Sequence, residues 1–311
     1  SDSALEVRNI FMKILKKYNV QVHLNEPVTS ITVQENRVVG VTTDKEQYAC
    51  DAAIICTGGA SYPLTGSTGD GYVLAEKVGH TITDIRPSLV PIVTNETWVK
   101  ETMGLSIRNV EVSVISKSKA QAKQFGAMMI THFGLTGPTI FSLSNTLGKL
   151  FRKKNPQITI EINLKPALTA EVLDKRLQKD FDLYSKKQLV NGMKDLLPVN
   201  LIPIVIKLAE LNPAKPINQI TKEERLRLCH VLQHMTVTVK ELRPVAEAIV
   251  TAGGISLKEF NPKTMESKLI GGLYGAGEVL DIDAFTGGYN LQAAFSTGYV
   301  AAMHAVHGDE E

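Results

Sequence analysis

The chain has 311 residues, of which 43% are hydrophobic and 21% charged, a composition typical of ordinary globular proteins. Its 34 Lys and Arg against 32 Asp and Glu leave a formal charge of +2, so charge gives no reason to expect nucleic acid or a membrane surface as a partner. The 3 cysteines are too scattered for a disulfide framework, and no apolar run approaches the roughly 20 residues of a membrane span. We therefore expect a cytoplasmic protein that acts on a small-molecule substrate, with no nucleic acid or membrane as partner and with an oligomer left open.

The first 85 residues mix helical and strand patterns. In chain order they predict a helix at residues 4–19 capped by Ser3, a strand at 20–24, a hairpin at 27–44, a buried strand at 47–59 and a short helix at 70–80. The buried strand is almost purely apolar and ends in Thr-Gly-Gly. Such a run is typical of a central parallel strand whose carboxyl end opens into a ligand-binding loop.

A different pattern begins at residue 86. Strands are predicted at 88–95, 109–119, 125–134 and 156–164, and helices at 170–198, 201–212 and 221–235. Residues 86–245 therefore read as an insertion that is β-rich at 86–165 and helical at 166–245. Strand patterns return at 241–261 and 271–281, and a terminal helix begins at the glycines 287 and 288.

Glycine is concentrated in two places. Of the 23 glycines, 6 lie between residues 58 and 79 and 7 lie between residues 271 and 298. Glycine serves where a backbone takes positive φ or approaches another group closely, so the clusters suggest two loops around one ligand. The alternative is that both are merely turn-rich connections.

The residues in these clusters suit an anionic, hydroxyl-rich ligand. Backbone N–H groups at the start of the terminal helix suit an anion or a carbonyl oxygen, carboxylates suit polyol hydroxyls, and the first loop suits a pyrophosphate or its neighbour. The candidates are Thr57, Gly58, Gly59, Ser67, Thr68, Gly69 and Asp70 in the first cluster, and Gly277, Glu278, Asp281, Gly287, Gly288, Tyr289, Asn290 and Leu291 in the second.

Residues 55–80, 128–138 and 248–302 resemble the BaiN/YhiN-type family of NAD(P)/FAD-dependent oxidoreductases, which are aminoacetone oxidase-like flavoproteins. The resemblance implies an α/β, glutathione-reductase-like FAD-binding fold, formed by residues 1–85 and 246–311, with an inserted β-barrel-like and helical substrate domain. It implies FAD as cofactor, with NAD(P)H as a candidate electron donor. The reaction would be amine or alcohol oxidation, or reduction of an unsaturated compound.

The family's N-terminal GxGxxG unit, which binds the ADP half of FAD, has no counterpart in this sequence. The nearest strings, at 66–71 and 275–277, have the wrong spacing or context. We therefore expect an N-terminally truncated piece of the family's chain, which holds FAD weakly or not at all.

Site roles follow from the resemblance residue by residue. It implies that the backbone of Val28 touches the adenine end of FAD, that Thr57 to Gly59 pass near the pyrophosphate, and that Glu278 faces the pyrophosphate or ribityl region. The N–H groups from Gly288 to Leu291 would point at the flavin N1–C2=O edge, where they stabilise the negative charge of reduced flavin.

Three side chains are candidates for catalysis: His132, Tyr62 and Tyr289. Each has a structural alternative, a hydrogen-bonded turn for the histidine and packing beside a glycine loop for the tyrosines. Cys56 reads as a buried small hydrophobe rather than a redox thiol. His230 and His234, with Cys229 beside them, recur at helical spacing but lack a carboxylate at ligand spacing, so no metal site is expected.

Two rival functions stay open. The glycine loops would also fit a non-catalytic binding or scaffold module without flavin. A fumarate-reductase-like ene-reductase would need an arginine acid, and no motif places one among the candidates Arg108, Arg152, Arg176, Arg225, Arg227 and Arg243.

Overall fold

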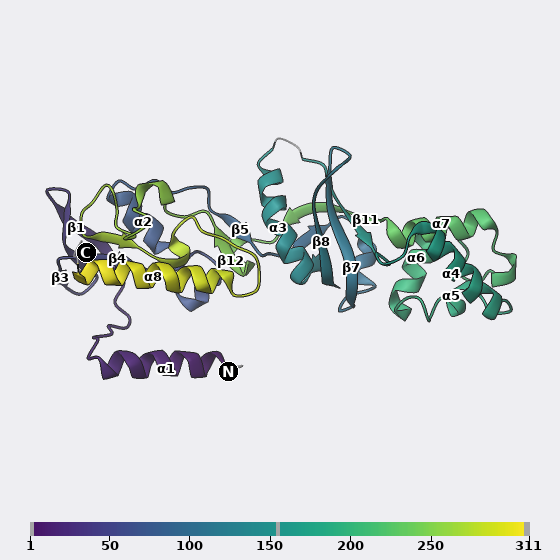
Figure 1. Ribbon diagram of the computed structural model, residues 1–311, viewed down its shortest axis with the longest axis horizontal. Helices are drawn as coiled ribbons and strands as arrows, with labels where there is room; N and C mark the ends of the chain where they lie inside the picture. The colour runs from purple at the N-terminus through teal and green to yellow at the C-terminus, as the bar shows by residue number, and fades with distance from the viewer. Residues whose placement is uncertain (1–2, 154–155, 308–311) are drawn as a thin grey trace.

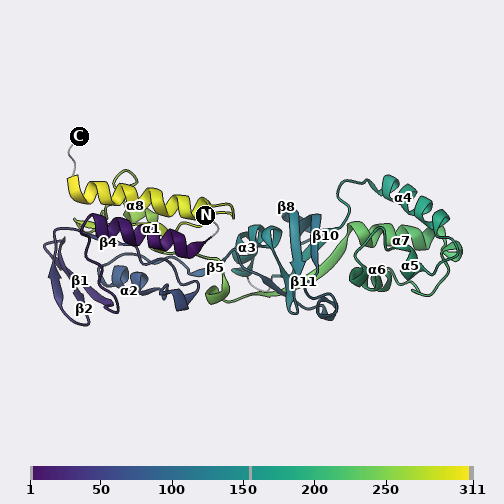
Figure 2. The same cartoon turned by 90° about the horizontal axis from the view of Figure 1, so that it is seen from below.

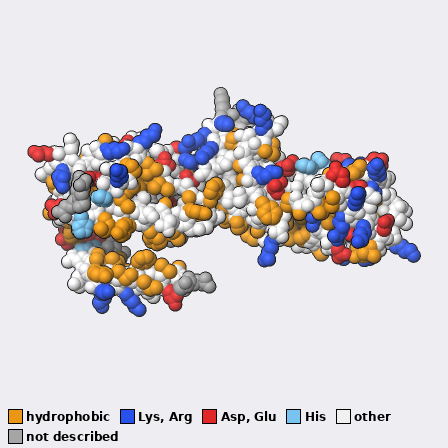
Figure 3. Space-filling view, viewed as in Figure 1, with side chains coloured by type: hydrophobic (Ala, Val, Ile, Leu, Met, Phe, Trp, Pro, Cys, Tyr) orange, Lys and Arg blue, Asp and Glu red, His pale blue; other side chains and the backbone are white. Residues whose placement is uncertain are grey.

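The computed structural model describes residues 3–153 and 156–307, which form three bodies in a row (Figure 1). An α/β body contains both ends of the chain, a β-barrel lies in the middle, and a group of helices lies at the far end. The α/β body has a hydrophobic core of its own, whereas the barrel and the helices share a second core. In Figure 3, apolar side chains are prominent over the α/β body, while charged side chains are prominent over the helical end.

The α/β body is built on two small sheets. Its helices and strands are α1 (Ala4–Lys17), β1 (Val28–Gln34), β2 (Arg37–Thr43), β3 (Gln47–Ala49), β4 (Ala53–Ile55), α2 (Asp70–Lys77), β13 (Leu273–Gly275) and α8 (Tyr289–His307). Strands β1, β2 and β3 form an antiparallel sheet, and β4 pairs with β13 in parallel. Glu35 and Asn36 both take positive φ (47° and 60°), the backbone that a tight two-residue hairpin turn requires.

The predicted strand at residues 20–24 is wrong, because the described structure contains no strand there. Val20, Val22 and Leu24 are 50%, 45% and 71% exposed. An extended segment becomes a strand only when a neighbour supplies hydrogen bonds, and this one lies in the connection between α1 and the sheet, away from it (Figure 1).

Helix α1 forms as its pattern predicts, although it is not buried. Ser3 caps it by accepting a hydrogen bond from the Glu6 N–H (3.4 Å). No residue of the helix is buried, and Phe11 reaches Phe295 of α8 at 6.2 Å between ring centroids. Figures 1 and 2 both show α1 running alongside α8.

The barrel has the closed strand order β10-β11-β6-β9-β8-β7. Its strands are β6 (Ile92–Thr94), β7 (Ser106–Ser116), β8 (Lys119–Ile130), β9 (Gly134–Thr136), β10 (Ile158–Asn163) and β11 (Met235–Leu242). Alternation turns Ile158, Ile160 and Ile162 of β10 into the core, each at most 1% exposed. Strands β5 (Arg86–Ser88) and β12 (Val250–Ala252) pair antiparallel where the chain enters and leaves the barrel.

Helix α3 (Pro138–Phe151) lies within the region predicted to be β-rich and was not predicted. It starts directly after Gly137 with proline at its first position, where the missing N–H removes no helical bond. Its buried face contains Ile140, Leu143 and Leu147 at helical spacing. The helix packs on β8 and β5, and so connects the barrel with the α/β body.

The helical end contains α4 (Ala170–Leu183), α5 (Leu189–Gly192), α6 (Ile202–Leu208) and α7 (Lys222–Gln233). Thr221 and Glu224 form a capping box at the start of α7, and Arg225 Nε donates to Asp174 Oδ1 (2.6 Å), which joins α7 to α4. Short 3-10 helices occur at Pro63–Thr65, Thr97–Lys100, Val199–Leu201, Ile217–Gln219, Val245–Glu247, Leu257–Glu259 and Gly277–Val279. Of the strand pattern predicted at 241–261, Val250–Ala252 forms a regular strand beyond the end of β11.

Helix α2 packs tightly on the ends of β4 and β13 through Gly71. A Cβ at this position would overlap Thr57 Oγ1 and lie 2.8 Å from Val279 Cγ2. We expect Gly71→Ala to lower the free energy of unfolding by about 1–3 kcal/mol, because overpacking outweighs the gain in helix propensity.

Urea denaturation measures this loss. The matched control is Gly298→Ala in α8, where nothing lies within 4 Å of the added Cβ. That variant should gain up to about 1 kcal/mol. Equal stability of Gly71→Ala and the unsubstituted chain would show that the contact at α2 is looser than described.

The histidine after α2 anchors a buried polar cluster. The His80 side chain is 0% exposed, with Nδ1 2.9 Å from Glu259 Oε2 and Nε2 2.9 Å from Ser267 Oγ. Burial raises the pKa of Glu259, but hydrogen bonds from Thr81 and His80 outweigh it and leave this pKa below its ordinary value.

A lowered carboxyl pKa makes the unfolded chain take up a proton first on acidification. The stabilisation from Glu259 is therefore present above the ordinary glutamate pKa of about 4.3 and is lost as the pH falls towards the folded-state pKa. We expect the difference in unfolding free energy between the unsubstituted chain and Glu259→Gln to shrink over that range. Glu76→Gln, at an exposed position of α2, is the matched substitution control. A difference constant from pH 6 to pH 3 would refute this assignment.

Candidate functional site

Two strands bring the glycine clusters together. Gly275 of β13 lies opposite Ile55 of β4 in the parallel register, and the Ala276 N–H donates to the Ile55 carbonyl (3.0 Å). The loops that follow these strands therefore start side by side, at the edge where ligands of α/β folds bind.

Thr251 of β12 connects the two loops. Its N–H donates to Glu278 Oε1 (2.8 Å), and its Oγ1 accepts from the Ala60 N–H (2.8 Å) and lies 2.9 Å from Ser61 Oγ. A Cβ on Gly59 would overlap Thr251 Oγ1 and lie 2.6 Å from Glu278 Oε1, so this close approach requires glycine. The carboxylate of Glu278 is thus held by a backbone donor at the junction.

Tyr72 of α2 lies behind this junction and is 8% exposed. Burial, and then the negative charge of Glu278, raise the pKa of Tyr72 to about 12. The phenol therefore stays protonated at neutral pH, and we assign it no proton-transfer role beside the Glu278 carboxylate.

The start of α8 presents backbone donors at the same place. The Gln292 N–H makes the first helical bond, to the Gly288 carbonyl (2.9 Å), so the N–H groups of Tyr289, Asn290 and Leu291 precede it. The Asn290 side chain points back instead of outward: Oδ1 accepts from the Ala284 N–H (2.9 Å) and Nδ2 donates to the Ala284 carbonyl (3.0 Å). Asn290 therefore fixes the loop before the helix.

A cavity of about 420 Å³ opens beside this helix start, and we call it the α8 cavity. It is lined by Leu89, Ile249, Val250, Glu278, Phe285, Thr286, Gly287, Gly288, Asn290, Leu291 and Ala294. One wall is apolar, and the other combines a carboxylate with the positive end of the helix dipole. This lining suits a planar ring with polar atoms on one edge.

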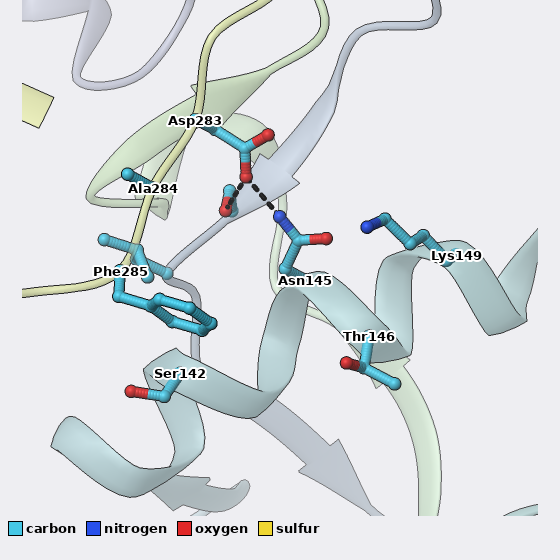
Figure 4. Close-up of a pocket in the computed structure, with 9 residues that line it drawn as sticks. Ser142, Asn145, Thr146, Lys149, Asp283, Ala284 and Phe285 are labelled. Carbon is cyan, nitrogen blue, oxygen red and sulfur yellow. Dashed lines mark hydrogen bonds between the residues drawn. The ribbon is translucent and has the colours of Figure 1, made fainter. Parts of the chain in front are cut away.

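A second cavity of about 270 Å³, the α3 cavity, lies on the other side of the loop (Figure 4). It is lined by Ser88, Leu89, Ser142, Asn145, Thr146, Lys149, Asp283, Ala284 and Phe285. Ser88 Oγ donates to Asp283 Oδ2 (2.8 Å), and Asn145 Nδ2 donates to the same oxygen. Leu89 and Phe285 line both cavities. Leu89 holds positive φ (52°), a strained backbone for leucine of the kind that clusters at functional sites.

The structure places the predicted cofactor residues in different surroundings. Glu278, Gly287, Gly288, Asn290 and Leu291 line the α8 cavity, whereas Tyr289 is not part of the lining and is 63% exposed, with its ring 3.4 Å from an added Cβ on Gly287. Thr57, Gly58, Gly59 and Gly277 occupy the strand ends beside it, Ser67 faces Gly58, Gly69 and Asp70 begin α2, and the Asp281 N–H donates to the Ile255 carbonyl.

Three predicted residues lie apart from both cavities. Val28 is 37% exposed on β1, and Tyr62 is 51% exposed in the loop before α2. His132 is exposed in the turn between β8 and β9, with its ring 4.9 Å from that of Phe133. The structure therefore does not bring His132 to the junction.

Cys56 corrects one expectation, because its side chain is exposed and not buried. The protein atoms packed around the thiol still raise its pKa, so it is no activated thiolate. Cys229 is buried on α7, where His230 and His234 lie 4.9 Å apart between ring centroids. Within residues 3–153 and 156–307, no group of three or more potential ligands gathers around a metal position.

The sequence did not point to Thr251, Ser88, Asn145 or Asp283. For Thr251 the sequence offers a weak indication of a site role, because it lies just before the Gly253–Gly254 pair. The same holds for Asp283, which lies shortly before the second glycine loop. Asn145 lies in the helix that was not predicted, so no pattern could connect it with Asp283.

No helix in the described part of the chain is long and apolar enough to span a membrane. Similar proteins of known name align with most of the chain. The chain is 27% identical to the 3-dehydro-bile acid delta(4,6)-reductase of Clostridium scindens over 309 residues, and the aligned region covers 98% of this chain and 74% of that protein. It is 30% identical over 292 residues to the ribosomal RNA dihydrouridine synthase of Haemophilus influenzae (92% and 69%), and 27% identical over 307 residues to that of Escherichia coli (98% and 73%).

Among solved structures, GidA of Aquifex aeolicus aligns with 96% of this chain at 14% identity and a TM-score of 0.38, and this chain spans about half (49%) of its length. The family model described as the HI0933-like protein Rossmann domain matches residues 1–304, which confirms a Rossmann-type α/β fold. The chain therefore belongs to the HI0933-like family of FAD-dependent oxidoreductases, which confirms the family resemblance of residues 55–80, 128–138 and 248–302.

Proposed function

We propose that this enzyme reduces a carbon–carbon double bond conjugated to a carbonyl group, and that FAD binds in the α8 cavity. The observation that supports this best is the meeting of the β4 and β13 loops with the start of α8 around one cavity. The cavity offers an apolar wall for the flavin ring and N–H groups for its polar edge, so the residues present fit the ring and ribityl part of FAD.

The named activities of the relatives share this chemistry. The delta(4,6) double bonds of a 3-dehydro-bile acid are conjugated to its 3-oxo group, and the double bond lost in dihydrouridine is conjugated to the C4 carbonyl of uracil. We therefore favour reduction of an unsaturated compound over amine or alcohol oxidation. When bound and first reduced by two electrons from NAD(P)H, the flavin would supply a hydride to the β-carbon of the conjugated unit, and a proton would complete the α-carbon.

The residues of the chain have separate tasks in this proposal. The N–H groups of Tyr289 to Leu291 stabilise negative charge on the flavin edge, and Leu89, Ile249 and Val250 keep water from the reacting face. Glu278, held by Thr251, accepts from ribityl hydroxyls. Asn290 acts as a positioning residue because it fixes the loop at Ala284.

The remaining assignments extend the same proposal. Thr57 to Gly59, Ser67, Gly69 and Asp70 follow FAD towards its pyrophosphate, and Val28 would lie towards the adenine. Residues 86–245 would form the substrate domain. Tyr289 is a better candidate proton donor than His132, because it lies between Gly288 and Asn290 of the cavity lining and His132 lies in the turn between β8 and β9.

Reduction of a conjugated alkene is tested with the full chain after loading with FAD and anaerobic reduction by NADPH or dithionite. Adding 2-cyclohexen-1-one should restore the absorbance of oxidised flavin and yield cyclohexanone. Cyclohexene, which lacks the carbonyl, should do neither. If neither compound reoxidised the reduced flavin, and amines or alcohols instead reduced the oxidised flavin, the proposal would be refuted in favour of substrate oxidation.

The loop assignment is tested by Asn290→Ala. The substitution removes the side-chain hydrogen bonds to Ala284 that fix the loop, so the N–H groups that should face the flavin lose their fixed orientation. We therefore expect FAD affinity to fall about tenfold. Titration followed by flavin fluorescence measures this, and Gln292→Ala, an exposed position one residue beyond the first turn, is the control. Equal FAD affinity of Asn290→Ala, Gln292→Ala and the unsubstituted chain would contradict the assignment.

A further inference from the structure

Two histidines meet where the helical end joins the barrel, and no role described so far uses them. His230 lies in the last turn of α7, and His234 is the residue that ends this helix. Their rings lie 4.9 Å apart between centroids, and both residues are exposed. In Figure 3, histidine side chains are visible on the surface between the barrel and the helices, with acidic side chains beside them. The fold therefore holds two imidazoles together where an ion from solution can reach them.

A carboxylate from a distant strand contacts one of these rings. Oε2 of Glu161, on β10, lies 3.2 Å from Nδ1 of His234. The sequence near the histidines offers no carboxylate at ligand spacing, and the packing of α7 on β10 supplies this one. A carboxylate that accepts a hydrogen bond from Nδ1 leaves the lone pair of the ring on Nε2, and it orients the ring as in zinc sites. Nε2 of His234 is therefore available as a metal ligand.

His230 offers a second ligand on the same face of the helix. Its ring forms no hydrogen bond or ion pair with another residue in the described part of the chain, so its nitrogens are open. Histidines four residues apart on one helical face can bind the same zinc ion. An ion at this place would also lie at the carboxyl end of α7, where the helix dipole favours positive charge.

The surroundings restrict the kind of ion. The two rings line a cavity of about 480 Å³ between α4 and α7, which leaves room for water ligands. Cys229 is buried, and burial raises the pKa of its thiol to about 11, so it stays protonated and does not act as a ligand. Asp174, in the same lining, is paired with Arg225.

Two imidazoles with open positions suit a particular class of metal. No third protein ligand gathers with the pair within residues 3–153 and 156–307, so water would complete the coordination. Imidazole suits zinc, copper and nickel, whereas magnesium and calcium prefer oxygen ligands.

We propose that His230 and His234 bind a divalent transition-metal ion of the zinc type, with Glu161 as the residue that orients His234. The ion fastens the last turn of α7 to β10 through this carboxylate, and so joins the helical end to the barrel. The site lies outside both the α8 cavity and the α3 cavity, and the inference does not depend on flavin.

Isothermal titration calorimetry of the full, metal-free chain with ZnCl2 tests the site. We expect one ion to bind with a dissociation constant below about 100 μM, and MgCl2 to give no binding. His230→Gln and His234→Gln should each weaken zinc binding at least about tenfold. The matched control is His304→Gln, which changes a histidine in the last turn of another helix, α8, and should leave the affinity unchanged.

Three outcomes would overturn the site. They are no zinc binding at about 1 mM, binding that survives both substitutions on α7, and binding that is lost with His304→Gln instead.

The role of Glu161 is tested by two substitutions at that position. Glu161→Ala removes the group that orients His234 and should weaken zinc binding about tenfold. Glu161→Gln retains an acceptor oxygen and should restore part of the affinity. Glu241→Ala, at an exposed position of the neighbouring strand β11, is the control. Full zinc affinity in Glu161→Ala would refute the orienting role.

The fastening of the helices to the barrel is tested by urea denaturation. Trp98, the single tryptophan, is buried in the core that the barrel and the helices share, so its fluorescence follows the unfolding of both. Because an ion that binds the folded state stabilises it, zinc should raise the urea midpoint of the unsubstituted chain and not that of His234→Gln. An equal midpoint with and without zinc would refute the fastening. None of these measurements uses flavin or turnover, so their failure would leave the proposed reaction untouched.

Discussion

The parallel pairing of β4 with β13 is the constraint on which the candidate site depends. These strands are more than 200 residues apart in the sequence (Ile55 and Gly275), and their register sets both glycine loops at one edge. Glycines are required there for packing: side chains at Gly59 or Gly71 would collide with Thr251, Glu278 or Thr57. The same close approach leaves backbone N–H groups and a carboxylate facing one cavity, so tight packing and ligand binding have a common cause.

The barrel contributes to the site through a narrow connection. Strands β5 and β12 pair where the chain crosses between the two bodies, and both supply site residues, Ser88 from one and Thr251 from the other. Asp283 then accepts hydrogen bonds from Ser88 and from Asn145 of α3. Asp283 directly precedes Ala284, to which Asn290 of α8 is hydrogen-bonded. A shift of α3 that moved Asp283 would therefore also move the loop at the start of α8.

Features that depend on neighbouring residues could be predicted from the sequence, whereas features that depend on distant partners could not. The Thr-Gly-Gly strand end, the hairpin at Glu35 and the terminal helix are encoded in neighbouring residues, and they were predicted. The strand at residues 20–24 failed because β structure needs a partner, which local pattern does not reveal. Helix α3 was missed although Pro138 and the spacing of Ile140, Leu143 and Leu147 are helical, because the flanking strands dominated the interpretation.

The site residues also divide into those recognisable from local sequence and those that depend on distant partners. Glycines and the Glu278 carboxylate were identifiable because their residue types are unusual in a strand end, whereas Thr251 and Asn145 are ordinary residues whose importance arises from distant partners. His132 shows the converse, since a titratable side chain in a recognisable motif lies apart from the junction. Residue chemistry proposes candidates, but the pairing of distant strands decides which of them meet, and here it favours the start of α8 and the polar face of α3.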